Sequence, residues 1–124
     1  MNIIINENTF KCKVCVTPSS ILEGMQNKTF DMNFNGMFFM LPNNGDQSFW
    51  MYDCITPLDI IFIDENTITS IHSGCSPCDD EMSCEYYKGV GNRVLEVAGG
   101  TCDSLNIKVG GHRKDVPILI NFRI

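Results

Sequence analysis

The chain of 124 residues is predicted to form a mostly β domain of the α+β class, a small barrel-like or two-sheet structure with one short helix near the N-terminus. Two observations lead to this prediction. Short apolar stretches recur along the chain, and clusters of Gly, Pro, Asn and Asp separate them, as is typical of short strands joined by turns. Helix signals are confined to brief segments. The length suits one hydrophobic core, so we expect a single domain over residues 1–124.

The first apolar segments, residues 2–6 and 9–16, are expected to pair as a hairpin. In the second arm every other residue is apolar, which is the period of a strand with one buried face. Phe10 and Cys12 fall on this apolar face, whereas Cys15 falls on the opposite face together with two lysines. We therefore expect Cys12 in the core and Cys15 at the surface.

A short helix is expected directly after this hairpin. Thr17 is a favourable N-cap, and Pro18 suits the first helical position because the N–H that proline lacks would be unpaired there anyway. The apolar residues that follow have helical spacing, and we expect the helix to end at Asn27 or Lys28. Residues 29–35 show no regular period and are expected to form a loop.

The most apolar part of the chain is residues 48–64, which follow an apolar strand at 36–41. This part contains the only tryptophan, Trp50. It is expected to be a strand buried on both faces and interrupted at Pro57, because proline has no N–H for a sheet hydrogen bond. Asp59 lies inside the apolar run, and a buried charge needs a partner.

The second half of the chain alternates strands with turns. We expect strands over residues 67–72, 93–98 and 117–124, one helical turn over 101–106, and a turn at Gly110-Gly111. The longest polar segment, residues 73–89, lies between the first two of these strands. A loop of this length in a small domain usually covers or lines something.

Two acidic residues that lie in apolar strands, Asp59 and Glu96, are the leading candidates for a functional site. Two carboxyl groups roughly 5–10 Å apart can act as the acid and base of a hydrolase, as in glycosidases. Trp50 and Tyr52 lie nearby in the sequence and offer aromatic faces to a sugar or another flat ligand. The sequence therefore predicts a pocket around these four residues.

The alternative is that both carboxylates only stabilise the fold. In that interpretation Asp59 accepts hydrogen bonds from backbone donors freed by the interruption at Pro57, and Glu96 forms an ion pair with Arg93 or Lys28. Buried carboxylates occur in structural networks as well as in active sites, so both interpretations stay open.

The seven cysteines include two Cys-x-x-Cys pairs, Cys12–Cys15 and Cys75–Cys78. A four-cysteine zinc site is disfavoured because Cys12 and Cys15 point to opposite faces of a strand. The acidic residues that follow Cys78 disfavour the thiolate that redox catalysis requires. A disulfide between Cys78 and Cys84, unpaired thiols, or a metal site of Cys75, Cys78 and Cys84 are left as alternatives, and we expect no metal and no cofactor.

Several motifs together indicate a family. They are Gly36-Met37-Phe38-Phe39, Ser48-Phe49-Trp50-Met51, the segment from Thr56 to Asp64, and Val94-Leu95-Glu96 with Gly99-Gly100. From about Phe10 to Gly110 the chain resembles the family called domain of unknown function 192, which comprises small prokaryotic and viral proteins. The resemblance implies a compact, mostly β fold with one helix packed across it. It implies no established activity.

The chain also departs from the pattern of this family. Members often begin with a signal peptide or a lipoprotein start, and neither is visible here. Their helix carries arginines where this chain has Ile21 and Glu23, which puts any function of those arginines in doubt in this protein. The segment from Pro77 through Cys84 to Tyr86 resembles one that some members have before the Val-Leu-Glu strand.

The charge and the apolar content of the sequence limit the kinds of partner that the protein can bind. The formal net charge of −6 argues against nucleic-acid binding, which needs a basic surface. No stretch approaches the roughly 18 apolar residues of a membrane span, and the first residues lack a basic signal-peptide start, so a cytoplasmic location is expected. The expected partner is a small molecule or another protein.

Three functions remain as hypotheses at this point. The first is a small soluble binding module whose pocket involves Trp50, Tyr52, Asp59 and Glu96. The second is a paired-carboxylate hydrolase that uses Asp59 and Glu96 on a saccharide-like substrate. The third is a structural or accessory protein, of the viral kind, in which these residues only maintain the fold. We favour a protein that is not an enzyme.

Overall fold

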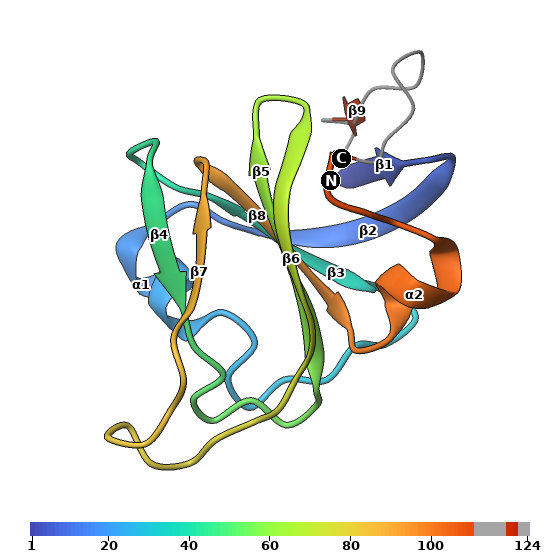
Figure 1. Cartoon of the computed structure of the whole chain (residues 1–124). Coiled ribbons are helices and arrows are strands. Elements are labelled where there is room, and N and C mark those ends of the chain that lie inside the picture. The colour runs from blue at the N-terminus through green and yellow to red at the C-terminus, as the bar shows by residue number, and fades with distance from the viewer. Residues whose placement is uncertain (111–118, 122–124) are drawn as a thin grey trace.

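A curled seven-stranded sheet forms the main body of the computed structural model, which describes residues 1–110 and 119–121 (Figure 1). The order of its strands is β6-β5-β8-β3-β2-β1-β9. A second sheet pairs two further strands, and two short helices complete the described fold. The prediction of a mostly β fold with short helices is therefore confirmed.

The strands of the large sheet are β1 (Asn2–Ile5), β2 (Asn8–Cys15), β3 (Gly36–Met40), β5 (Leu58–Asp64), β6 (Thr67–Cys75), β8 (Arg93–Ala98) and β9 (Leu119–Asn121). The small sheet pairs β4 (Asp46–Phe49) with β7 (Tyr87–Val90), and the helices are α1 (Pro18–Glu23) and α2 (Thr101–Leu105). Only β2 and β3 pair in parallel, among the strands described, and the connection between them carries α1. All other neighbours described pair antiparallel, and short turns join β1 to β2 and β5 to β6.

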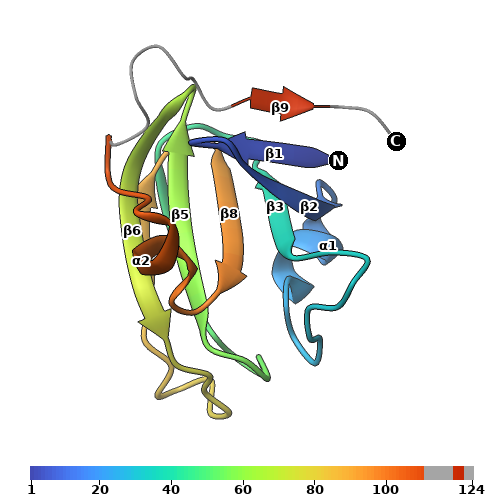
Figure 2. The same ribbon diagram turned by 90° about the vertical axis from the view of Figure 1, so that its right-hand side faces the viewer.

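Both faces of the large sheet are covered, and each cover encloses its own apolar core. Helix α2 lies over one face, whereas α1 and the β4–β7 sheet lie over the other (Figures 1 and 2). The core under α2 includes Ile61, Leu95 and Val97. The core on the opposite face includes Ile60 and Val94, together with several sulfur-containing side chains. Because neighbouring residues of a strand point to opposite faces, β5 and β8 contribute to both cores.

The second core corrects the expectation for Cys15. This residue is buried, with 4% of its surface exposed, and belongs to the core on the α1 side. Cys12, as expected, is buried in the other core. The alternation of apolar and polar residues in β2 predicted correctly which residues share a face. The face with Cys15, however, packs against another layer of the protein and is not exposed to water.

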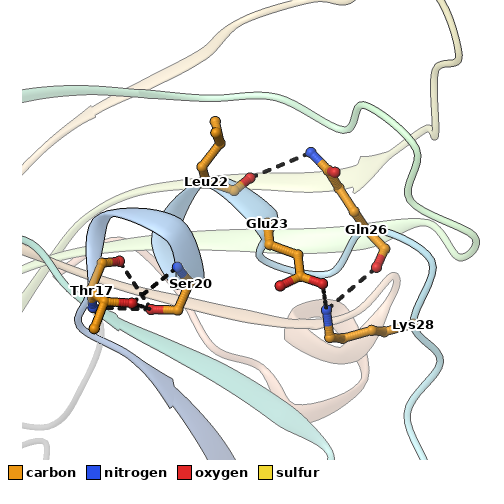
Figure 3. A network of polar contacts seen from close by, with 6 residues as sticks. All are labelled: Thr17, Ser20, Leu22, Glu23, Gln26 and Lys28. Carbon is orange, nitrogen blue, oxygen red and sulfur yellow. Dashed lines mark hydrogen bonds and ion pairs between the residues drawn. The ribbon is translucent and has the colours of Figure 1, made fainter.

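Helix α1 begins where the sequence predicts. Thr17 accepts a hydrogen bond from the Ser20 backbone N–H at 3.2 Å, and the Ser20 hydroxyl accepts one from the Thr17 N–H at 3.0 Å (Figure 3). This reciprocal pair fixes the first turn. The expected end at Asn27 or Lys28 is wrong, because the helix ends at Glu23 and Gly24 forms its C-cap with a positive φ of 46°. Glycine tolerates that conformation.

The boundaries of the other strands differ from the predicted ones mainly around the polar segment, residues 73–89. Strand β6 continues to Cys75, so the loop before β7 covers residues 76–86 and is shorter than residues 73–89. The predicted last strand, residues 117–124, lies outside the described residues except for Leu119–Asn121, as does Gly111 of the predicted turn. Neither helix in the described part of the chain is long and apolar enough to cross a lipid bilayer.

Candidate functional site

Asp59 anchors backbone segments on the α2 side of the sheet. Its side chain is fully buried. One carboxylate oxygen accepts hydrogen bonds from the N–H groups of Gly74 at 2.8 Å and Gly100 at 3.1 Å. The other oxygen accepts one from the N–H of Cys102 at 2.9 Å. Gly100 and Cys102 form the start of α2, so Asp59 ties this helix and the end of β6 to the middle of the sheet.

Asp59 accepts hydrogen bonds from backbone N–H groups, as the structural alternative predicted. The donors, however, do not lie near Pro57 in the sequence. The N–H groups belong to the end of β6 and the start of α2, far from Asp59 in the sequence. Hydrogen bonds to a buried, charged carboxylate are among the stronger ones in proteins, so these three contacts stabilise the fold. All of these bonds are internal to the protein, which is the arrangement of a structural residue.

Glu96 lies on the opposite face of the sheet. It pairs in register with Ile60 of β5 and Met37 of β3, whereas Asp59 pairs with Val97. Neighbouring residues of a strand point to opposite faces, so Asp59 points toward α2 and Glu96 toward the other core. The structure therefore does not bring these two carboxyl groups together into one site.

The Glu96 carboxyl is 3% exposed and has no hydrogen bond or ion pair within the described residues. Neither Arg93 nor Lys28 pairs with it there, and Lys28 instead contacts Glu23 at 3.0 Å (Figure 3). Burial alone raises the pKa of Glu96 from 4.5 to about 8, because a charged carboxylate without a partner is poorly tolerated away from water. At neutral pH this side chain is mostly an uncharged acid.

Three free thiols surround this acid closely enough to interact with it electrostatically. Burial raises the pKa of Cys15 and Cys75 to about 11 and that of Cys54 to about 12. Burial is the largest cause of each shift, and the negative charge of ionised Glu96 contributes to the same raised pKa values. Since the thiolate is the reactive form, these cysteines are poor nucleophiles at neutral pH.

The aromatic rings of Trp50 and Tyr52 lie next to each other, and the ring of Tyr86 also contacts Trp50. The ring of Trp50 lies 5.1 Å from that of Tyr52 and 5.9 Å from that of Tyr86, measured between centroids. The Trp50 and Tyr86 rings are stacked, with an angle of 15° between their planes. Tyr86 is 56% exposed, and the other two are partly exposed. We call Trp50, Tyr52 and Tyr86 the aromatic cluster.

The pairing of β4 with β7 explains this stacking. Phe49 and Tyr87 are opposite each other at the end of the small sheet. In an antiparallel pair the next residues outward, Trp50 and Tyr86, are then also neighbours, and their side chains lie within reach of each other. Two residues far apart in the sequence thus form one aromatic surface.

A surface pocket of about 410 Å³ lies next to the aromatic cluster. Its lining residues come from three segments and include two carboxylates and one free thiol: Asn27, Asp53, Cys54, Ile55, Pro77, Cys78 and Asp79. We call it the acidic pocket. The connection to the cluster is Tyr52, which directly precedes the pocket residue Asp53 and forms a β-bridge with the pocket residue Cys78.

Backbone hydrogen bonds hold the walls of the acidic pocket together. The Asp53 N–H donates to the Cys78 carbonyl at 2.8 Å, and the Cys78 N–H donates to the Met51 carbonyl at 3.2 Å. The Asn27 N–H donates to the Asp53 carbonyl at 2.8 Å. A disulfide between Cys78 and Cys84 closes the loop that carries one wall. The pocket is therefore bordered by connected segments.

Negative charge dominates this region. The pKa of Tyr52 is raised, first by the charge of Asp53 and then by partial burial and the charges of Glu81 and Asp79. None of these three acids forms an ion pair in the part of the chain that the structure describes. Lys28 offsets part of this charge at the pocket residue Cys54, whose pKa is raised mainly by burial and lowered by Lys28. The charges that act on Tyr52 are all negative.

The disulfide uses both cysteines of the 76–86 loop. Pairing of Cys78 with Cys84 removes two of the three thiols that the metal alternative requires, and Cys75 is a free, buried thiol. His72 contacts the Lys88 carbonyl at 2.7 Å. Across residues 1–110 and 119–121, no group of three or more His, Cys, Asp or Glu side chains is arranged to hold a metal ion.

Tyr86, Asp53 and Asp79 were not predicted from the sequence as site residues. The sequence carried a signal for two of them, because the polar segment that was expected to cover something contains both Asp79 and Tyr86. Asp53 follows Tyr52 directly and has a positive φ of 54°, a conformation rare for residues with a Cβ atom. Its place in the pocket depends on a contact with Cys78 that sequence patterns do not reveal.

Comparisons with known proteins agree on the fold. The family model DUF192, described as "Uncharacterized ACR", matches residues 1–113. A crystal structure of a protein of unknown function from Novosphingobium aromaticivorans is similar, with a TM-score of 0.76 and 25% sequence identity over 88% of this chain and 80% of that chain. A crystal structure described as a putative transcription regulator from Sinorhizobium meliloti has a TM-score of 0.75 and 24% identity, over 88% and 86% of the two chains. No curated protein matches the chain.

Proposed function

Because this chain belongs to the DUF192 family, which is described as uncharacterized, we propose its function from the site alone: it is a binding module that takes up a small ligand at the aromatic cluster and the acidic pocket. The observation that carries this proposal is the stacked, solvent-facing pair of Trp50 and Tyr86 beside a pocket of about 410 Å³. Ligand pockets of small molecules commonly have such volumes and combine aromatic faces with a few polar groups.

The position of the polar groups supports binding more than hydrolysis. Asp59 uses its carboxylate on internal backbone donors, and Glu96 points to the opposite face of the sheet. In a paired-carboxylate mechanism, both carboxyl groups of the enzyme must contact the same substrate. The carboxylates of the acidic pocket, Asp53 and Asp79, can instead orient a ligand by charge and hydrogen bonds while the rings supply contact area.

A fragment screen by two-dimensional NMR tests this proposal. We expect fragments that bind to shift the signals of the Trp50 indole N–H and of the backbone around Asp53 and Asp79. Replacing Tyr86 by Ala should weaken such fragments about tenfold, because one face of the aromatic cluster is lost. Tyr86 is 56% exposed, so the variant is expected to fold.

The matched control is Val90→Ala, which removes an exposed apolar side chain from β7 without touching the aromatic cluster. It should leave fragment affinities unchanged. Fragment shifts that gather elsewhere on the protein, or affinities that Tyr86→Ala leaves intact, would contradict the proposal.

A further inference from the structure

We infer that the ligand of this site is a small organic cation, a molecule that carries an alkylammonium head group. The inference rests on the proposed binding function and adds the chemical class of the ligand. It follows from the aromatic faces, from the unpaired carboxylates beside them, and from the size of the pocket.

The aromatic cluster is the first reason. The face of an aromatic ring carries partial negative charge, and cations bind to it, most strongly to tryptophan. Trp50 and Tyr52 are only partly exposed, whereas Tyr86 is 56% exposed. Their rings therefore border a surface that is apolar and still attracts positive charge.

The second reason is the charge beside these rings. Asp53 directly follows Tyr52 and lines the acidic pocket together with Asp79. The charges of Asp53, Glu81 and Asp79 raise the pKa of Tyr52. Within residues 1–110 and 119–121 none of them has a cationic partner, whereas Lys28 is engaged by Glu23. An incoming cation would supply the missing partner, and an anion would be repelled.

The acidic pocket limits the size of the ligand. A volume of about 410 Å³ accommodates a small molecule with a compact head group. The walls are joined by the hydrogen bonds between Asp53 and Cys78 and by the disulfide from Cys78 to Cys84. A site whose walls are already held in place loses little entropy when it binds a ligand, which favours a small, rigid head group over a flexible chain.

A fluorescence titration separates this inference from the proposed function. Trp50 is the only tryptophan, so its emission reports on the site directly. We expect choline to change this emission in a saturable way and to bind about tenfold more tightly than its uncharged analogue 3,3-dimethylbutan-1-ol, which has the same shape. Added salt should weaken the binding of choline.

The acids are tested with a double variant, Asp79→Asn with Glu81→Gln. Both side chains are exposed, and we expect choline affinity to fall about fivefold because two partners of the cation are lost. Asp46→Asn with Glu65→Gln removes two exposed carboxylates outside the acidic pocket and serves as the charge-matched control.

Two results would overturn the inference, and each leaves the binding function to be judged by the fragment screen. In one, the uncharged analogue or methyl glucoside binds as tightly as choline, which shows a site selective for shape or sugar instead of charge. In the other, choline leaves the emission of Trp50 unchanged.

Discussion

Replacing Asp59 by Asn is expected to lower the free energy of unfolding by roughly 3–5 kcal/mol. The Asp59 carboxylate accepts hydrogen bonds from the N–H groups of Gly74, Gly100 and Cys102. An amide has one oxygen acceptor, and its NH₂ group would face backbone N–H donors instead of accepting hydrogen bonds from them. Cys102 is buried, and its N–H would be left without a partner, which is costly. The start of α2 should therefore loosen, and the end of β6 with it.

Chemical denaturation monitored by circular dichroism measures this loss. The control is Asp64→Asn at the end of the same strand, where the side chain is partly exposed. Among the described residues its side chain makes one long hydrogen bond, with Asn44 at 3.5 Å. This control should change stability by less than about 1 kcal/mol. If Asp59→Asn also changed stability by less than about 1 kcal/mol, the three hydrogen bonds of Asp59 would contribute little to the stability of the fold. In folded Asp59→Asn protein, choline affinity should be unchanged, since Asp59 faces away from the site.

Replacing Glu96 by Gln is expected to stabilise the protein by roughly 3 kcal/mol at pH 7. Burial raises the pKa of Glu96 from 4.5 to about 8 in the folded state. Between these two values the unfolded chain has released the proton and the folded chain retains it. The folded state then binds more protons, so the stability of the natural protein decreases as the pH rises from 4.5 through 8. Glutamine is neutral throughout and removes this dependence.

The measurement is the free energy of unfolding of both proteins at several pH values from 4 to 9. Below pH 4.5 they should be similarly stable, and the difference should grow with pH until about pH 8. Glu65→Gln, at an exposed position in the turn between β5 and β6, should keep the slope of the natural protein. If Glu96→Gln retained that slope, or were less stable at pH 7, the buried carboxyl would have a partner that offsets its burial.

Local signals in the sequence predicted most of the fold. The alternation in β2, the apolar run of β5 and the cap at Thr17 each depend on residues close together in the chain, so they can be read without a structure. The need of Asp59 for partners also followed from its apolar surroundings. Only the identity of the donors, Gly100 among them, required the structure.

The candidate site was predicted only in part, because it depends on the register between distant segments. Asp59 and Glu96 would share a face if β8 were shifted by one residue against β5, since such a shift reverses which side chains face which core. The sequence does not specify this register. In the same way, the stacking of Trp50 on Tyr86 depends on the pairing of Phe49 with Tyr87.

The burial of Cys15 was missed for a related reason. Its strand shows one apolar face and one polar face, which is typical of a sheet exposed to water on one side. In the structure, the end of β2 lies under the layer that contains Met25 and Phe34, so both of its faces are covered there. A strand pattern reports which residues share a face but not what covers that face.

The central claim, that the aromatic cluster and the acidic pocket bind a small cation, is tested most directly by intermolecular nuclear Overhauser effects in a sample with saturating choline. The account predicts effects from the N-methyl protons of choline to the ring protons of Trp50, Tyr52 and Tyr86. Tyr87, whose ring contacts His72, is the internal control and should show none. Effects to Tyr87 or to other parts of the protein, with none to the aromatic cluster, would contradict the account.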